Sequence, residues 1–224
     1  MPSLGTSFFA HRNFLRSLCD HTLVKPYFSF GLGAALCLLL TSCVVDSVNP
    51  LGSPESAKID QRLLGYWVAP NGDIVHFSAK DTHWMEVVTT PKPSEASDNS
   101  TATQKPEPNV FFVTTIGEDN YLNMRSTNNG SKVTYSLFRY TITPDQTLHM
   151  WGLSQDEMAS AVRAGKLKGA VREQGTTGHP PHTDVDVHLT DSSDHLVKYI
   201  ARHDPTDLFD AETDPLTKVR TNGD

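Results

Sequence analysis

Hydrophobic residues follow two patterns along the chain. Close to its beginning they form one long apolar run, from Tyr27 to Leu40. After residue 60 they recur in short runs of aromatic and β-branched residues separated by turn residues, a pattern typical of β-strands. The predicted strands are Leu63–Val68, Asp73–Ser78, His83–Thr89, Val110–Ile116, Tyr121–Ser126, Lys132–Thr143, Thr147–Leu153 and, closing the series, Asp184–Leu189.

Turn residues connect these runs at short intervals. Asn71-Gly72, Asn129-Gly130 and Pro144-Asp145 are dipeptides that favour hairpin turns. About eight strands joined by short turns predict a mainly β fold, in which a single antiparallel sheet is closed or nearly closed to remove its edges. We expect two short helices beside this sheet, so that the fold is a β-rich α+β one.

Each of the two predicted helices has a recognisable start. Ser154-Gln155-Asp156-Glu157 matches a capping box, in which the serine hydroxyl and the glutamate carboxylate satisfy free amides. Gly165 can end that helix by adopting a positive φ, and Leu167 can pack back onto it. The second helix is expected to begin at Asp-Ser-Ser, residues 191–193, and to bury an apolar side that includes Leu196.

Polar segments divide the chain into parts. The segment from Asp46 to Ser56 contains prolines, a glycine and serines without an apolar period, so residues 43–60 are predicted to form a flexible tether. Pro91 to Pro108 carries four prolines and almost no apolar side chain, which predicts an exposed or disordered loop at about 91–108. Residues 61–224 are enough for one well-buried core, so a single β-rich domain is expected.

The beginning of the chain has the three parts of a secretory signal. Basic residues come first, the apolar run follows, and the small residues Thr41 and Ser42 stand before Cys43. The sequence Leu40-Thr41-Ser42-Cys43 resembles the lipobox of bacterial lipoproteins. The resemblance implies that residues 1–42 are a cleaved signal peptide and that Cys43 receives diacylglycerol. It also implies anchoring in the cell envelope.

The same resemblance implies a location within the envelope. Val44 and Val45 follow the cysteine, where an aspartate would retain an enterobacterial lipoprotein in the inner membrane. The outer membrane, facing the periplasm, is therefore expected. Two alternatives concern the leader: Tyr27 to Val45 could be an uncleaved membrane anchor, and translation could start at Leu23 or Val24, which would shorten an unusually long signal.

Cysteine content and charge agree with this interpretation. The three cysteines are Cys19, Cys37 and Cys43, so the mature chain would have no free thiol. The net charge is −7, and removal of residues 1–42, with three basic residues and one acid, changes it to −9. Nucleic acid is not an expected partner, because phosphate backbones require clustered cations. The one basic cluster, Arg163 to Arg172, is flanked by acids and predicts a solvated helix end.

Candidate chemistry is limited to a group of histidines and aspartates. His179, His182 and His188 are interleaved with Asp184 and Asp186. On a strand, the side chains of Asp184, Asp186 and His188 would share one face, where they could approach a metal ion. The alternation is equally typical of a half-buried strand with a solvated face, and we favour that reading and predict no metal site. Neither a Gly-x-Ser-x-Gly elbow nor a glycine-rich phosphate loop occurs. We therefore predict neither an enzyme nor a cofactor.

A second resemblance concerns the folded part. Gly65-Tyr66-Trp67, on the first predicted strand, is similar to the Gly-x-Trp motif on the first strand of lipocalin-like barrels, where the tryptophan closes one end. This resemblance implies a structural role for Trp67 and binding of a small apolar ligand inside the barrel. The alternative is a protein–protein interaction or structural module. Leu63–Trp67 and Ala164–Gly169 are also similar to segments of uncharacterised bacterial lipoproteins.

Overall fold

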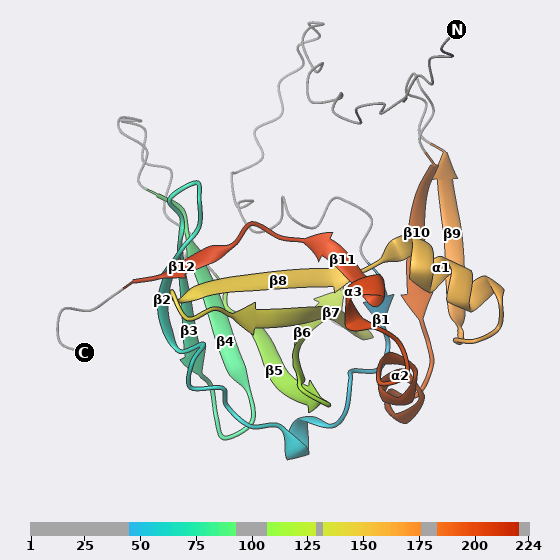
Figure 1. Cartoon of the computed structure of the whole chain (residues 1–224), viewed down its shortest axis with the longest axis horizontal. Coiled ribbons are helices and arrows are strands. Elements are labelled where there is room, and N and C mark those ends of the chain that lie inside the picture. The colour runs from blue at the N-terminus through green and yellow to red at the C-terminus, as the bar shows by residue number, and fades with distance from the viewer. Residues whose placement is uncertain (1–44, 93–106, 129–131, 176–182, 220–224) are drawn as a thin grey trace, which may run out of the picture. The chain divides into compact units, whose positions relative to one another are not determined.

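The computed structural model describes residues 45–92, 107–128, 132–175 and 183–219, and these form one twelve-stranded sheet with short helices beside it (Figure 1). Cys43, residues 1–42, the Asn129-Gly130 turn and most of the predicted loop at 91–108 lie outside the described residues. The strands are β1 Asp46–Ser47, β2 Gly65–Val68, β3 Ile74–Ala79, β4 Met85–Thr90, β5 Asn109–Ile116, β6 Asp119–Asn128, β7 Lys132–Ile142, β8 Thr147–Leu153, β9 Gly169–Gly175, β10 Thr183–Leu189, β11 Phe209–Glu212 and β12 Leu216–Lys218.

Eight of the strands form a closed antiparallel barrel. Strands β2 to β8 pair in sequence order, and β12 closes the ring by pairing with both β2 and β8. The predicted mainly β, lipocalin-like architecture is therefore confirmed. The predicted closing strand was wrong, because Asp184–Leu189 falls in β10, outside the barrel. Strand β12 has only three residues, too few to produce a recognisable alternation in the sequence.

The sheet continues beyond the barrel because β7 divides its edge between two partners. Its C-terminal half pairs with β8, whereas Tyr135 and Ser136 pair with β1. Strand β1 then pairs with β10, and β10 pairs with β9 along seven residues. In Figure 1 the resulting β9–β10 hairpin lies on the side of the barrel away from β2 to β4. Strand β9 contains Arg172, so the prediction of a helix end extending to that residue was wrong.

The helices are α1 Gln155–Arg163, α2 Ser193–Ile200 and α3 Pro205–Leu208, with a 3₁₀ turn at Pro54–Ser56. Two were predicted, and α3 was missed. Gly165 has φ +69° and follows α1, as expected, and Ser192 caps α2 by accepting a bond from the His195 amide. The capping box was wrong, because the Ser154 hydroxyl donates to Asp210 at 2.8 Å instead. In the described part of the chain, no helix has the length and apolarity needed to cross a bilayer.

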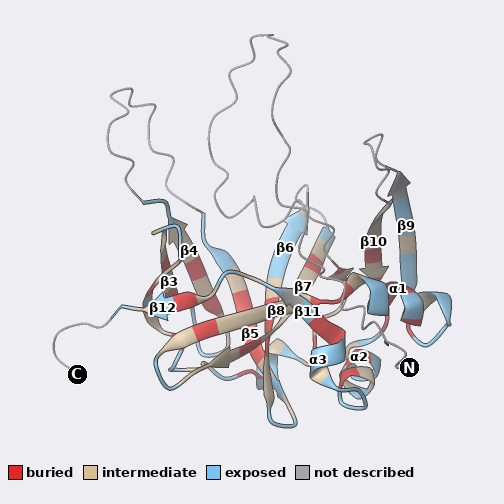
Figure 2. Ribbon diagram, turned by 45° about the horizontal axis from the view of Figure 1, so that its top comes forward, coloured by how far each residue is buried: buried red, intermediate tan, exposed pale blue. Residues whose placement is uncertain are grey.

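The buried side chains form two cores on opposite faces of the barrel wall. One consists of alternate residues from all eight barrel strands, and in a closed sheet that shared face is the interior. The other lies outside the wall, where the three helices and the β9–β10 hairpin cover it. Figure 2 shows the buried positions alternating along the strands. Leu208 and Phe209 belong to the outer core and fix the C-terminal segment there, as predicted.

The predicted tether is a folded part of the protein. Val45 is 3% exposed and Leu51 is fully buried, both in the outer core. The Leu51 amide donates to the Asn123 side chain at 2.7 Å, and its carbonyl accepts from the Thr114 hydroxyl at 2.6 Å. The prediction of flexibility over 43–60 was therefore wrong for residues 45–57. Side chains of other strands satisfy this segment's backbone, so it folds without a hydrophobic period of its own.

Candidate functional site

The barrel interior, where a carried ligand would lie, is filled by large side chains. Each of the eight strands contributes at least one buried residue, and Leu63 joins them from the segment before β2. The members of this core exposed by less than 2% are Leu63, Trp67, Met85, Phe111, Leu122, Tyr140 and Leu148. The rings of Trp67 and Phe77 meet edge to face with centroids 6.4 Å apart, and Phe77 meets Phe111 in the same way at 5.8 Å. Edge-to-face contacts of this kind are the packing that a continuous aromatic core favours.

Trp67 is fully buried in this interior, in line with the structural role that its resemblance implies. Its indole N–H donates to the Leu63 carbonyl at 2.8 Å, and Lys218 of β12 lies over the ring at 5.3 Å from the centroid. The Lys218 ammonium also donates to the Arg62 carbonyl at 2.7 Å. One cation thus joins the last strand of the barrel to the first strand and to the segment before it.

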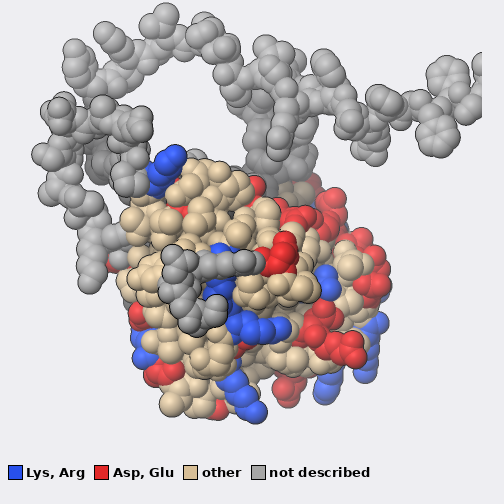
Figure 3. All heavy atoms as spheres, turned by 60° about the vertical axis from the view of Figure 1, so that its left-hand side comes forward, with Lys and Arg blue, Asp and Glu red and all other residues tan. Residues whose placement is uncertain are grey.

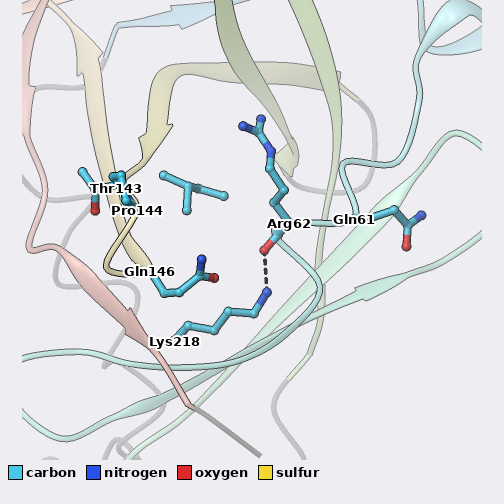
Figure 4. A pocket seen from close by; sticks show the side chains of 7 residues that line it. Gln61, Arg62, Thr143, Pro144, Gln146 and Lys218 are labelled. Carbon is cyan, nitrogen blue, oxygen red and sulfur yellow. Dashed lines mark hydrogen bonds between the residues drawn. The ribbon is translucent and has the colours of Figure 1, made fainter. Parts of the chain in front are cut away.

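A hollow of about 470 Å³ with both polar and apolar lining lies next to Lys218. Its lining comes from Gln61 and Arg62, from the turn between β7 and β8, and from Lys218. Figure 4 shows Lys218 reaching the Arg62 carbonyl while the guanidinium of Arg62 extends away from it. None of the buried interior side chains lines this hollow, although Ile142, which packs against them, does.

Asp60 is a half-buried acid beside Arg62. It accepts hydrogen bonds from the Arg62 guanidinium at 2.7 Å and from the Tyr140 hydroxyl at 2.8 Å. Burial opposes ionisation, but the bonds from Arg62 and Tyr140 outweigh it, so the pKa of Asp60 lies below its usual value. Burial, reinforced by the bond to Asp60, raises the pKa of Tyr140 well above its usual value. Both groups have fixed partners, which is typical of a structural contact.

The second polar hollow, of about 330 Å³, lies on the extension of the sheet beyond the barrel. Asp46 of β1, Lys132 of β7, Arg172 of β9, and Asp186 and His188 of β10 supply its charged and titratable groups. The His188 ring contacts Asp46 through Nδ1 at 2.7 Å and the Lys132 ammonium through Nε2 at 3.2 Å. We call this hollow, which Ala170 also lines, the charged hollow.

The histidine–aspartate group considered for metal binding falls partly in the charged hollow. His179 and His182 lie outside the described residues, and of Asp184 only the backbone position on β10 is described. Asp186 and His188 share one face of β10, as predicted, but Lys132 and Arg172 line the same hollow. Cations beside the acids disfavour a metal ion, and in the described residues no three potential ligands are placed so that they could hold one.

The sequence analysis did not single out Asp191, the one acid that is buried among the described residues. It is buried just before α2 and accepts bonds from the Lys168 amide at 2.9 Å, the Ser192 amide at 3.0 Å and the His195 ring at 2.6 Å. Burial raises its pKa, yet these hydrogen bonds prevail, and the pKa of Asp191 is lower than usual. Only its place in a helix-start motif marked it in the sequence.

We expect Asp191→Asn to lower the free energy of unfolding at pH 7 by about 1–3 kcal/mol, because the bonded carboxylate is lost. A lowered native pKa contributes stability above the unfolded-state pKa, and this stability is lost as the pH falls through the native value. The difference in free energy of unfolding between the natural protein and the variant should therefore become smaller below about pH 4. Urea unfolding at pH 7 and pH 3 measures both. The exposed Asp194 gives the control: Asp194→Asn should change stability by less than about 0.5 kcal/mol, and an equal effect of both variants would contradict the assignment.

Surface charge is mixed over the barrel side that Figure 3 presents. Lys and Arg side chains lie among Asp and Glu side chains there, and the acids gather toward one edge of that view. No known protein family matches the chain, and neither the curated proteins nor the solved structures include a significant match.

Proposed function

We propose that the protein is a lipid-anchored, non-catalytic component of a bacterial cell envelope. In this proposal a diacylglycerol on Cys43 holds it at the outer membrane on the periplasmic side. The support is the order of basic residues, apolar run and small residues that ends in Leu40-Thr41-Ser42-Cys43. Lipidation of this kind converts a secreted chain into one fixed to a membrane surface.

The folded domain acts, in this proposal, as an interaction or structural module for other envelope proteins. The observation that carries this choice is the filled barrel interior. A pocket for a small apolar molecule encloses most of the ligand surface and is lined mainly by apolar groups. Both hollows described above have charged side chains in their lining, and none of the buried interior side chains lines either of them. The packed interior therefore favours the module over the carrier that the lipocalin resemblance implies.

The outer surface of β2 offers a contact point for such a partner. Tyr66 is 52% exposed, and its ring stacks on that of His76 with centroids 4.2 Å apart. A tyrosine held flat by a neighbouring ring presents apolar area at low entropic cost, and tyrosine is enriched in protein interfaces. The contact lies on β2 and β3, in the barrel wall.

Native mass spectrometry of the protein extracted from its own membranes tests the module against the carrier. The expected spectrum contains the processed chain with its covalent lipid and no further apolar molecule, because the interior side chains occupy the space. Added oleic acid, used as a probe, should give no one-to-one complex that survives gentle desolvation. A stoichiometric apolar ligand retained through purification would contradict the module and restore the carrier.

A further inference from the structure

The chain is folded almost up to the residue that the proposed function lipidates. Val45 packs in the outer core, and Asp46 and Ser47 are hydrogen-bonded between β7 and β10. Only Val44 separates Cys43 from Val45. Consecutive Cα atoms are 3.8 Å apart, so the Cα atoms of Cys43 and Val45 are at most about 7.6 Å apart.

This length leaves no room for the domain to stand away from the membrane. The headgroup layer on each side of a bilayer is about 5–7 Å thick. A lipid on Cys43 would therefore bring the start of β1 to the level of the headgroups. The charged hollow begins at Asp46, one residue after Val45.

The charged hollow has the chemistry of a surface that meets phospholipid headgroups. Lys132 and Arg172 are exposed, and both cations can bind a phosphate, the arginine through two parallel bonds. Asp46 and His188 are less exposed, each by about 30%, and they are bonded to one another. Helix α1 packs on the other face of the hairpin, where Val187 joins the outer core, so α1 leaves the face with the charged hollow uncovered.

We propose that this face of β1, β10 and β9 lies directly against the bilayer, with phospholipid phosphates bound by Lys132 and Arg172. The proposal rests on the proposed lipidation of Cys43. It also fixes the orientation of the module: Asp46 pairs opposite Ser136 at the level of Met124, so the β5–β6 turn at Glu118 lies about 20 Å further along the strands and faces away from the membrane.

Fluorescence quenching in vesicles tests the orientation. The lipidated protein is reconstituted in phosphatidylethanolamine and phosphatidylglycerol that contain a headgroup-nitroxide lipid. A mature chain that begins at a lipid-blocked Cys43 has no other cysteine, so Ala170→Cys in the charged hollow and Glu118→Cys in the distant turn each accept one fluorophore. We expect quenching to be several-fold stronger at position 170. Equal quenching at both positions, or stronger quenching at 118, would overturn the proposal.

Charge reversal tests the role of the hollow itself. Lys132→Glu with Arg172→Glu should reduce quenching at position 170, whereas the matched control Lys58→Glu with Lys198→Glu, at exposed sites outside the hollow, should leave it unchanged. Unchanged quenching in the first pair would overturn phosphate binding by the hollow. Thermal unfolding of both double variants shows whether the fold persists. The intact mass of each sample separates the two proposals: an unlipidated Cys43 contradicts the anchor, and a lipidated chain without the quenching difference contradicts only the orientation.

Discussion

Cys43→Ala is expected to leave the protein as a precursor that still carries residues 1–42 and incorporates no labelled fatty acid. In the proposed anchor, the sulfur of Cys43 carries the diacylglyceryl group. The lipoprotein signal peptidase cleaves only the precursor that has been modified in this way. The effect is all or none, because no other residue at the cleavage site can form the thioether. Metabolic labelling with a radioactive or alkyne fatty acid, followed by electrophoresis, measures both labelling and processing.

The chain supplies its own controls for this experiment. Cys19 and Cys37 lie upstream of the lipobox, within the predicted signal peptide. Cys19→Ala and Cys37→Ala should preserve labelling and processing, since neither thiol follows the small residues. Normal processing of Cys43→Ala would refute the assignment of the anchor, and so would loss of labelling in all three variants.

Trp67→Ala should lower the free energy of unfolding by about 3–5 kcal/mol, the usual range for removing a large buried aromatic. The indole is fully buried and packs against Phe77, and it donates to the Leu63 carbonyl. Its removal also deprives Lys218 of the ring that the ammonium covers. Chemical unfolding followed by far-ultraviolet circular dichroism gives the free energy of both proteins.

Trp151 provides the matched comparison on the outside of the barrel. It is half-buried beneath Arg139, whose guanidinium lies 5.4 Å from the ring centroid. Trp151→Ala should cost about 1–2 kcal/mol, well below the cost at position 67. A barrel with room for a ligand would tolerate Trp67→Ala as well as Trp151→Ala, and equal costs would therefore contradict a packed interior.

The barrel was predictable where the strands are long enough to show a pattern. Seven of its eight strands, β2 to β8, were predicted within a few residues, because alternation over four or more positions is a direct result of one buried face. The turn at Asn71-Gly72 was predictable for a local reason: Gly72 has φ +89°, which other residues rarely adopt. Gly165, after α1, follows the same rule.

The remaining strands depend on partners that are far away in the sequence. Strand β1 has only two residues, and it forms because β7 and β10 pair with its backbone from both sides. Strand β9 contains two glycines and three polar residues, and its form follows from pairing with β10. The polar stretch before residue 57 looked like a tether because Asn123 and Thr114, which hold it, lie more than sixty residues later.

The candidate site likewise has features that a local sequence motif indicates and features that depend on strand pairing. A short local motif is sufficient to predict a lipobox, so the proposal that Cys43 is the anchor rests on the sequence alone. The alternation of Asp186 and His188 was also visible, but the cations that accompany them, Lys132 and Arg172, reach that face only through the pairing of β7, β1, β10 and β9. Whether the barrel interior is filled depends on the summed volumes of side chains from eight strands, which no single segment encodes.

The mass of the N-terminal peptide of the protein isolated from its own membranes tests the lipid anchor most directly. We expect a peptide that begins at Cys43 and carries a diacylglyceryl group on the sulfur, with residues 1–42 absent. An unmodified Cys43 in a chain that retains the upstream residues would contradict the lipid anchor, and with it the placement of the packed barrel at a membrane surface.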